Sequence, residues 1–312
     1  MDSATLAARR QETRRRRSVR TLLRFAGPLL YAAALATAIA VRGLPTSRDA
    51  LFLWILLGLL AFTLTDPRRW LKGVLADWLP FGAILFTYDL LRGSADEVFS
   101  AYYLPQLRAD ELMFGGAVPT VWLQERLWDG AGGIDWIDYA TWVVYLTHFF
   151  GTLVVAASLW LFARGYFRRY IAMVCALAAA GFVTYLLFPA APPWLASEQG
   201  HLAPTDRIVR FVSEDVPIGF FGAIWESGAR YANDVAAVPS LHAAYAALIS
   251  LFLWRIASWR WRVPLALYPL AMGFALVYTA EHYVSDILLG WLYAAGAVVL
   301  VDALARRWRV AG

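Results

Sequence analysis

Long apolar segments bounded by charged residues constrain the possible folds of this chain more than any other feature. An apolar helix needs about 20 residues to cross a bilayer, and eight segments approach or exceed that length. Apolar residues make up 60% of the chain and charged residues only 16%, which excludes an ordinary soluble domain. The pattern predicts an all-α integral membrane protein with about eight transmembrane helices, over residues 25–41, 50–65, 74–91, 136–163, 170–189, 240–257, 263–280 and 283–304.

The charges between these segments predict the orientation of the chain in the membrane. Basic residues accumulate in residues 1–24, 66–72, 164–169, 255–262 and 302–312, which together carry a charge of +16, whereas the rest of the chain carries −11. Because cytoplasmic loops are enriched in arginine and lysine, we expect both termini to be cytoplasmic. The acidic loops 89–138 and 198–234 then lie outside. We therefore expect a multi-pass protein of the cell inner membrane or plasma membrane.

We expect residues 1–24 and 306–312 to form tails, and residues 25–72 to form two N-terminal transmembrane helices. We interpret the arginine-rich first tail as a topology signal rather than a nucleic-acid arm, so no nucleic-acid partner is expected. The first apolar segment is long and lacks a convincing cleavage site, which favours a retained anchor over a signal peptide. The mixed polar and aromatic stretches 97–107 and 118–128 predict interfacial helices on the outer face, with disordered loop as the alternative.

Two of the four histidines lie where an outer loop enters a predicted helix. His242 belongs to the segment VPSLHAAY and His282 to the segment EHYVSD. Asp286 follows His282 by four residues, so the two side chains share one helix face and the carboxylate can hold the imidazole. The structural alternative is a pair that satisfies backbone groups at a helix start. Ionisable groups inside membrane spans are costly, which favours the functional interpretation.

Residues around these histidines are candidates for binding an anion. Ser240 follows Pro239 at the positive end of a predicted helix, where it could cradle a phosphate or merely cap the helix. Arg92 is the preferred outward-facing cation, although it could equally reach toward lipid headgroups. His148 lies within the fourth span and must face inward, as a substrate contact or as a packing residue, while His201 is expected at the surface. The other candidate cations are Arg126, Arg207, Arg210 and Arg230.

The pattern P-S-x-H followed by H-Y-x-x-D-x-x-x-G, here His282, Tyr283, Asp286 and Gly290, resembles the type-2 phosphatidic acid phosphatase superfamily. The sequence FPAAPPW over residues 188–194 resembles the inositol phosphorylceramide synthase branch of that superfamily and its bacterial relatives. The resemblance implies a lipid phosphotransferase or phosphatase-like membrane domain over residues 73–305. It also implies a metal-independent and cofactor-free mechanism.

In the mechanism that the resemblance implies, His282, held by Asp286, attacks phosphorus and forms a phosphohistidine. His242 protonates the leaving oxygen and later deprotonates the acceptor. Ser240, Tyr283, Arg92 and His148 would bind the substrate. The expected substrates are a phospholipid donor, with phosphoinositol as the expected transferred group, and a lipid or glycan hydroxyl as the acceptor.

The chain also departs from the phosphatases of this superfamily, which carry K-x6-R-P and S-R-x5-H-x3-D motifs. Ala275 and Leu276 occupy the serine and arginine positions of the second motif, and Lys72 has no R-P after it. These losses favour transfer over hydrolysis, with a lipid phosphate phosphatase as the alternative. Two further alternatives are a metal site formed by His242, His282 and Asp286, and a transporter, whose charges should instead lie at the membrane midplane.

Overall fold

The computed structural model describes residues 3–42, 48–92, 101–130, 132–216 and 233–310. Within these ranges the regular structure is helical, and the β-pairing consists of single bridges that join Ala190 to Tyr102 and to Ala236. The helices are α1 (Ser3–Arg42), α2 (Arg48–Thr63), α3 (Pro67–Gly73), the π-helical turn η1 (Val74–Trp78), α4 (Leu79–Arg92), α5 (Leu104–Met113), α6 (Pro119–Leu127), α7 (Trp136–Phe162), α8 (Arg164–Leu187), α9 (Pro193–Glu198), α10 (Ile208–Asp215), α12 (Leu241–Leu253), the 3-10 turn η3 (Trp259–Trp261), α13 (Arg262–Tyr278) and α14 (Val284–Val310).

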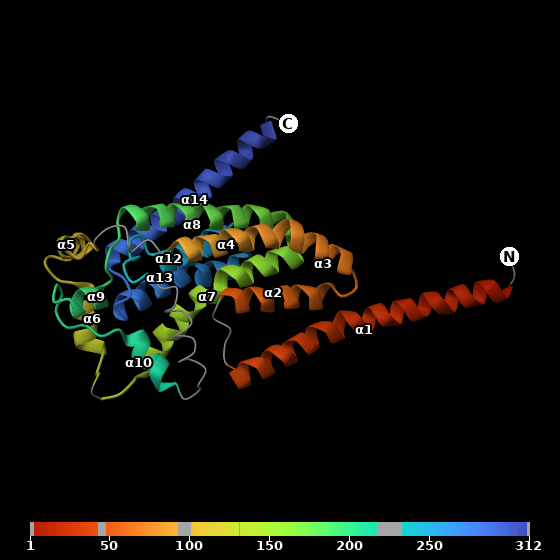
Figure 1. Ribbon diagram of the computed structural model, residues 1–312, viewed down its shortest axis with the longest axis horizontal. Helices are drawn as coiled ribbons and strands as arrows, with labels where there is room; N and C mark the ends of the chain where they lie inside the picture. Colours follow the sequence, from red (N-terminus) through yellow and green to blue (C-terminus); the bar gives the residue numbers. More distant parts are fainter. Residues whose placement is uncertain (1–2, 43–47, 93–100, 131, 217–232, 311–312) are drawn as a thin grey trace.

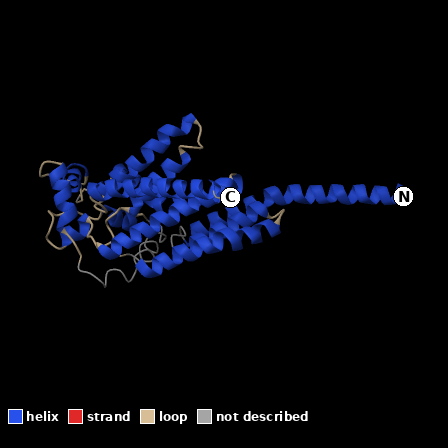
Figure 2. Cartoon of the chain, turned by 90° about the horizontal axis from the view of Figure 1, so that it is seen from above, coloured by secondary structure: helices blue, strands red, loops and turns tan. Residues whose placement is uncertain are grey.

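Helix α12 forms the centre of the bundle and packs against α7, α8, α13 and α14. Small residues make this possible, because buried alanines such as Ala243, Ala244 and Ala247 let neighbouring helices approach closely. The short helices α5, α6, α9 and α10 gather at one end of the bundle, and α3 lies at the other (Figure 1). Helix α1 extends far beyond the bundle, as Figure 2 shows from above. Residues of the expected first tail and of the first span thus form one continuous helix.

Five helical segments are long and apolar enough to cross a membrane. They are Thr21–Val41, Trp136–Phe162, Arg164–Leu187, Trp259–Tyr278 and Val284–Arg307, and two shorter apolar helices cover Ala50–Thr63 and Leu241–Leu253. The prediction of an all-α membrane protein is confirmed, whereas the number eight is not. The expected span 74–91 is divided between η1 and α4, where the buried carboxylate of Asp77 interrupts the apolar run.

Two buried carboxylates hold the arginine-rich end of the bundle together. Asp77 accepts hydrogen bonds from Trp160, Arg164 and Arg168, with the Arg164 Nη2–Asp77 Oδ2 distance at 2.7 Å. On α14, Asp302 pairs with Arg169 and Arg255. Residues 164–169 form the first turns of α8 and not the expected loop. Three segments with predicted cytoplasmic charge, 164–169, 255–262 and 302–312, therefore meet at one end, which agrees with the expected helix directions. Their side of the membrane stays a prediction.

The expected interfacial helices are only partly placed where the sequence suggested. The helix expected at 118–128 is α6, but the one expected at 97–107 is wrong in position, because α5 begins only at Leu104. Residues 97–100 lie outside the described residues. The backbone N–H of Tyr102 donates to the carbonyl of Pro189 at 2.8 Å, and Tyr102 forms a β-bridge with Ala190. The position of either helix at a membrane surface stays a prediction.

Candidate active site

The start of α12 carries the first part of the site. Ser240 is the N-cap of this helix, and its hydroxyl oxygen accepts a hydrogen bond from the N–H of Ala243 at 3.2 Å. Ser240 is completely buried, and its own N–H donates to the carbonyl of Asp286 at 3.0 Å. Tyr185 on α8 donates its hydroxyl hydrogen to the carbonyl of Pro239 at 2.8 Å. Ser240 therefore caps α12, which is one of its two predicted roles, and its backbone N–H joins α12 to the start of α14.

The start of α14 carries the second part. Nδ1 of His282 lies 3.4 Å from Oδ2 of Asp286, so the predicted contact is present, although His282 precedes α14 by two residues and does not share a helix face with Asp286. The same carboxylate oxygen accepts the backbone N–H of Tyr283 at 2.9 Å, which fixes its orientation. His282 is only 4% exposed and Asp286 only 1%. This burial strengthens the electrostatic interaction between the carboxylate and the imidazole.

The two helix starts bring the histidines into contact. Nε2 of His282 lies 3.3 Å from Nδ1 of His242, so Asp286, His282 and His242 form a continuous chain of polar groups. A lone pair on Nε2 and a proton on Nδ1 of the neighbouring ring are the two groups required for nucleophilic attack and for leaving-group protonation.

Gly290 explains why α12 and α14 can approach so closely. A Cβ atom at this position would lie 2.4 Å from the carbonyl oxygen of Ser240, a distance that real Cβ atoms essentially never show. The contact is between backbones, so no side chain can move aside. Gly290 thereby determines how far His282 lies from His242.

Aromatic rings on α7 cover the other side of His242. The ring centroid of His148 lies 3.9 Å from that of His242, and Tyr145 stacks on His242 at 5.2 Å. The structure thus places His148 inside the bundle next to the histidine pair, while its contact with a substrate stays a prediction. Tyr283 is fully buried and packs with Leu107 and Val118 rather than beside the imidazoles.

Sequence reasoning missed Asp110, which supports the start of α14 from α5. Its two carboxylate oxygens accept the backbone N–H groups of Val284 and Ser285, each at 2.9 Å. Burial raises the pKa of Asp110, because the lost hydration outweighs these hydrogen bonds to the charged form. Asp110 lies 174 residues from Val284 in the chain and belongs to no recognisable motif, so no local signal could have revealed this contact.

Among the candidate cations, Arg207 is the one that an ion pair in the described structure joins to the residue before His282. It makes a two-pronged ion pair with Glu281, the residue before His282, at 2.7 and 3.1 Å, and its guanidinium stacks over Trp194 at 4.3 Å. Burial lowers the pKa of Arg207, but the charge and hydrogen bonds of Glu281 raise it by more.

The other candidate arginines do not reach the histidine pair in the described structure. Arg126 stacks over Trp122 at 4.2 Å, and Arg210 pairs with Glu214 at 2.9 Å. The side chain of Arg92 and all of Arg230 lie outside the described residues.

The positions that carry cations in the phosphatases remain apolar here. Ala275 and Leu276 are completely buried, and Leu276 belongs to the hydrophobic core around Met272. Lys72 is exposed on α3, at the opposite end of the bundle from α5, α6 and α9 (Figure 1). Among the described residues there is no group of three histidine, cysteine or acidic side chains arranged to hold a metal ion.

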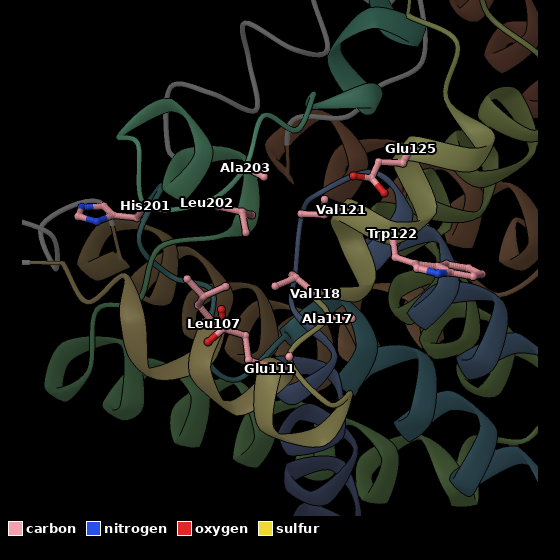
Figure 3. Close-up of a pocket in the computed structure, with 11 residues that line it drawn as sticks. Leu107, Glu111, Ala117, Val118, Val121, Trp122, Glu125, His201, Leu202 and Ala203 are labelled. Atoms are coloured by element: carbon pink, nitrogen blue, oxygen red, sulfur yellow. The ribbon is translucent and has the colours of Figure 1, made fainter.

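A pocket of about 370 Å³ opens beside α5 and α6 and was not foreseen from the sequence. Glu111 from α5, Glu125 from α6 and His201 from the loop after α9 contribute its polar side chains (Figure 3). Tyr283 packs against Leu107 and Val118, which also line this pocket. The pocket thus adjoins the residue that follows His282, and His201, expected as ordinary surface, lies on its rim.

Comparison with known proteins gives two matches. A family model described as the PAP2 superfamily matches residues 125–300. A protein of Bacteroides thetaiotaomicron named phosphoinositol dihydroceramide synthase is 36% identical over 122 residues, which cover 35% of this chain and 37% of that protein. The chain therefore matches well under half the length of this relative. No solved structure matches the chain significantly.

Proposed function

Because the chain belongs to the PAP2 superfamily and is an enzyme of the phosphatase or phosphotransferase type, we propose that it is a membrane phosphotransferase with lipid substrates. The transferred group is a phosphoryl headgroup, with phosphoinositol as the group we expect, and the acceptor is a lipid or glycan hydroxyl. The partial relative named phosphoinositol dihydroceramide synthase supports this choice. The 3.3 Å contact between His242 and His282 is the observation that carries the proposal.

In the proposed first step, Nε2 of His282 attacks phosphorus and the bond to the leaving lipid oxygen breaks. His242 gives its proton to that oxygen, so that diacylglycerol leaves a glycerophospholipid donor and a phosphohistidine remains. In the second step His242 takes the proton of the acceptor hydroxyl, the new oxygen–phosphorus bond forms and the bond to Nε2 breaks. General acid–base help of this kind contributes about 10²- to 10⁴-fold.

The contact between the two histidines leaves no room for a phosphorus atom between their ring nitrogens. At 3.3 Å the two ring nitrogens are within direct hydrogen-bonding distance, so a phosphorus atom bonded to Nε2 requires His242 to turn aside. Tyr145 stacks on His242 and the ring of His148 lies tilted against it, so both rings limit the directions in which His242 can turn. We propose that His242 faces the leaving oxygen once it has turned.

Two features favour transfer over hydrolysis. The cation positions of the phosphatase motif are filled by Ala275 and Leu276, and His282 is only 4% exposed. Excluding water from a reactive phosphohistidine protects it until the acceptor hydroxyl arrives. The predicted topology would place this chemistry on the extracytoplasmic face.

The test is to incubate the purified protein in detergent with phosphatidylinositol labelled in its phosphate, with and without a panel of ceramide, diacylglycerol and glycan acceptors. A labelled lipid or glycan that forms only with acceptor supports transfer. Labelled inositol phosphate that forms at the same rate with and without acceptor would instead establish hydrolysis. Phosphatidate, offered as a second donor, distinguishes headgroup transfer from simple dephosphorylation.

A further inference from the structure

A second cavity lies between α12, α13 and α14, in the half of the bundle that carries the arginine clusters. Helix α12 packs against both α13 and α14, whereas α13 and α14 hardly touch each other. The space between them is a cavity of about 410 Å³ whose exposed surface is almost entirely apolar. Its walls include Ala247, Ser250 and Trp254 from α12, Ala266 from α13 and Trp291 from α14.

Two residues that line this cavity each carry a buried polar atom without a partner. Neither Oγ of Ser250 nor Nε1 of Trp291 makes a hydrogen bond to any described residue, and Ser250 is only 6% exposed. A buried hydroxyl or indole N–H without a partner destabilises a protein, and an indole N–H can only donate. An occupant that offers a hydrogen-bond acceptor, such as an ester carbonyl, would satisfy one of these groups.

The mouth of the cavity is basic and aromatic. Arg262 lies four residues before Ala266 on α13, which puts it on the same helix face about one turn, or roughly 6 Å, nearer the membrane surface. Its guanidinium lies 5.6 Å from the ring centroid of Trp254, which lines the cavity. No carboxylate among the described residues pairs with Arg260 or Arg262.

Exposed aromatic residues mark the same level of the bundle as a membrane interface. Trp259 is 74% exposed and Trp261 is 62% exposed, and both alternate with the two arginines. Tryptophan is typical of the headgroup region, and arginines near an anionic leaflet attract its lipids. From the membrane surface inward, Arg262 therefore lies at headgroup depth. Ser250 lies about one turn of α12 deeper than Trp254, and the apolar walls of the cavity follow.

We propose that this groove between α13 and α14 binds one anionic glycerophospholipid from the leaflet at the arginine-rich end. Its phosphate contacts Arg262, an ester carbonyl accepts from Ser250 or Trp291, and an acyl chain fills the apolar cavity. Because the histidine pair lies at the opposite end of α12, this lipid is not the reacting substrate. It is a resident lipid that fills the space between α13 and α14, and the site is independent of the proposed transferase activity.

The test uses the purified full-length protein and native mass spectrometry, with phosphatidylglycerol and phosphatidylcholine of identical chains as probes. The wild type should retain one phosphatidylglycerol in preference to phosphatidylcholine. Ala266→Trp fills the cavity and should weaken retention by about tenfold or more, because several methylene groups lose their burial. Arg262→Gln should reduce the preference for phosphatidylglycerol about fivefold, the effect of one basic residue at an anionic surface.

Matched controls separate the groove from general lipid adhesion. Leu300→Trp adds a ring at an exposed site of α14 outside the cavity, and Arg307→Gln removes an exposed arginine at the same end of the bundle. Neither should change retention. Equal retention of both lipids by the wild type would overturn the proposal, as would unchanged retention by a folded Ala266→Trp variant. Should that variant fail to fold, the exposed Arg262→Gln still decides the outcome.

Discussion

Nε2 of His282 lies 3.3 Å from Nδ1 of His242, although 40 residues separate the two histidines in the chain. Each ring sits at the start of a helix, and the carbonyl of Asp286 receives the N–H of Ser240 between them. The proposed nucleophile, its carboxylate and the proposed acid are therefore held by one backbone junction. Substitutions in this junction are therefore expected to affect different steps of the proposed reaction.

His282→Ala should abolish both turnover and labelling of the protein from a phosphate-labelled donor, because no other group in the junction would carry the phosphoryl intermediate. The labelling is measured after a short incubation and alkaline quench, conditions under which phosphohistidine persists and phosphoesters of serine are distinguished from it. Arg307→Gln, at the other end of the bundle, serves as the matched control. Turnover by the alanine variant at the normal rate would exclude His282 as nucleophile.

His242→Gln should slow transfer by about 10²- to 10⁴-fold, the usual contribution of a general acid. The loss should shrink with a donor analogue whose leaving group is p-nitrophenolate, because that oxygen needs no proton to depart. Rates of phosphoenzyme formation with the two donors give the comparison. An equal loss with both would mean that His242 positions the substrate rather than protonating the leaving oxygen.

Asp286→Asn should keep the fold while slowing phosphoenzyme formation. The amide oxygen of asparagine can still accept the N–H of Tyr283, which Asp286 receives at 2.9 Å, but it cannot stabilise a positively charged imidazole. We expect a loss of about 10²- to 10⁴-fold in the attack step with little change in thermal stability. A variant that unfolds but labels normally per folded molecule would show that the carboxylate is structural.

The histidine pair and Asp286 were predictable because their signals are local. A spacing of four residues across a helix start keeps His282 close to Asp286, and the positions of His242 and His282 at the starts of apolar segments place them at one depth. The same locality explains the errors: 74–91 has the composition of one span, yet Asp77 is buried by arginines from another helix. Asp110 and the pairing of Arg207 with Glu281 depend on contacts between distant loops, which periodicity does not contain.

The role of Gly290 is visible partly in the sequence and partly only in the structure. Its place in the pattern after Asp286 is visible in the sequence, but the reason for glycine appears only where α14 meets the carbonyl of Ser240. Gly290→Ala should cost about 1–3 kcal/mol of stability and a larger share of activity, because separating the backbones moves His282 from His242. Gly296→Ala on the same helix is the control, since a Cβ there meets nothing within 4 Å, and should gain up to about 1 kcal/mol. Equal behaviour of both variants in thermal unfolding and turnover would refute this role.

The ion pair between Arg207 and Glu281 can be tested by substituting first one partner and then both. Arg207→Gln leaves a nearly buried carboxylate beside His282 and should destabilise the protein by about 3 kcal/mol, the lower end of the range for a broken buried pair. Adding Glu281→Gln removes that uncompensated charge and should restore most of the stability. If Arg207 also contacts the phosphate, the double variant regains stability but not turnover. Thermal unfolding and transfer rates of both variants separate these roles; recovery of full activity in the double variant would limit Arg207 to holding Glu281.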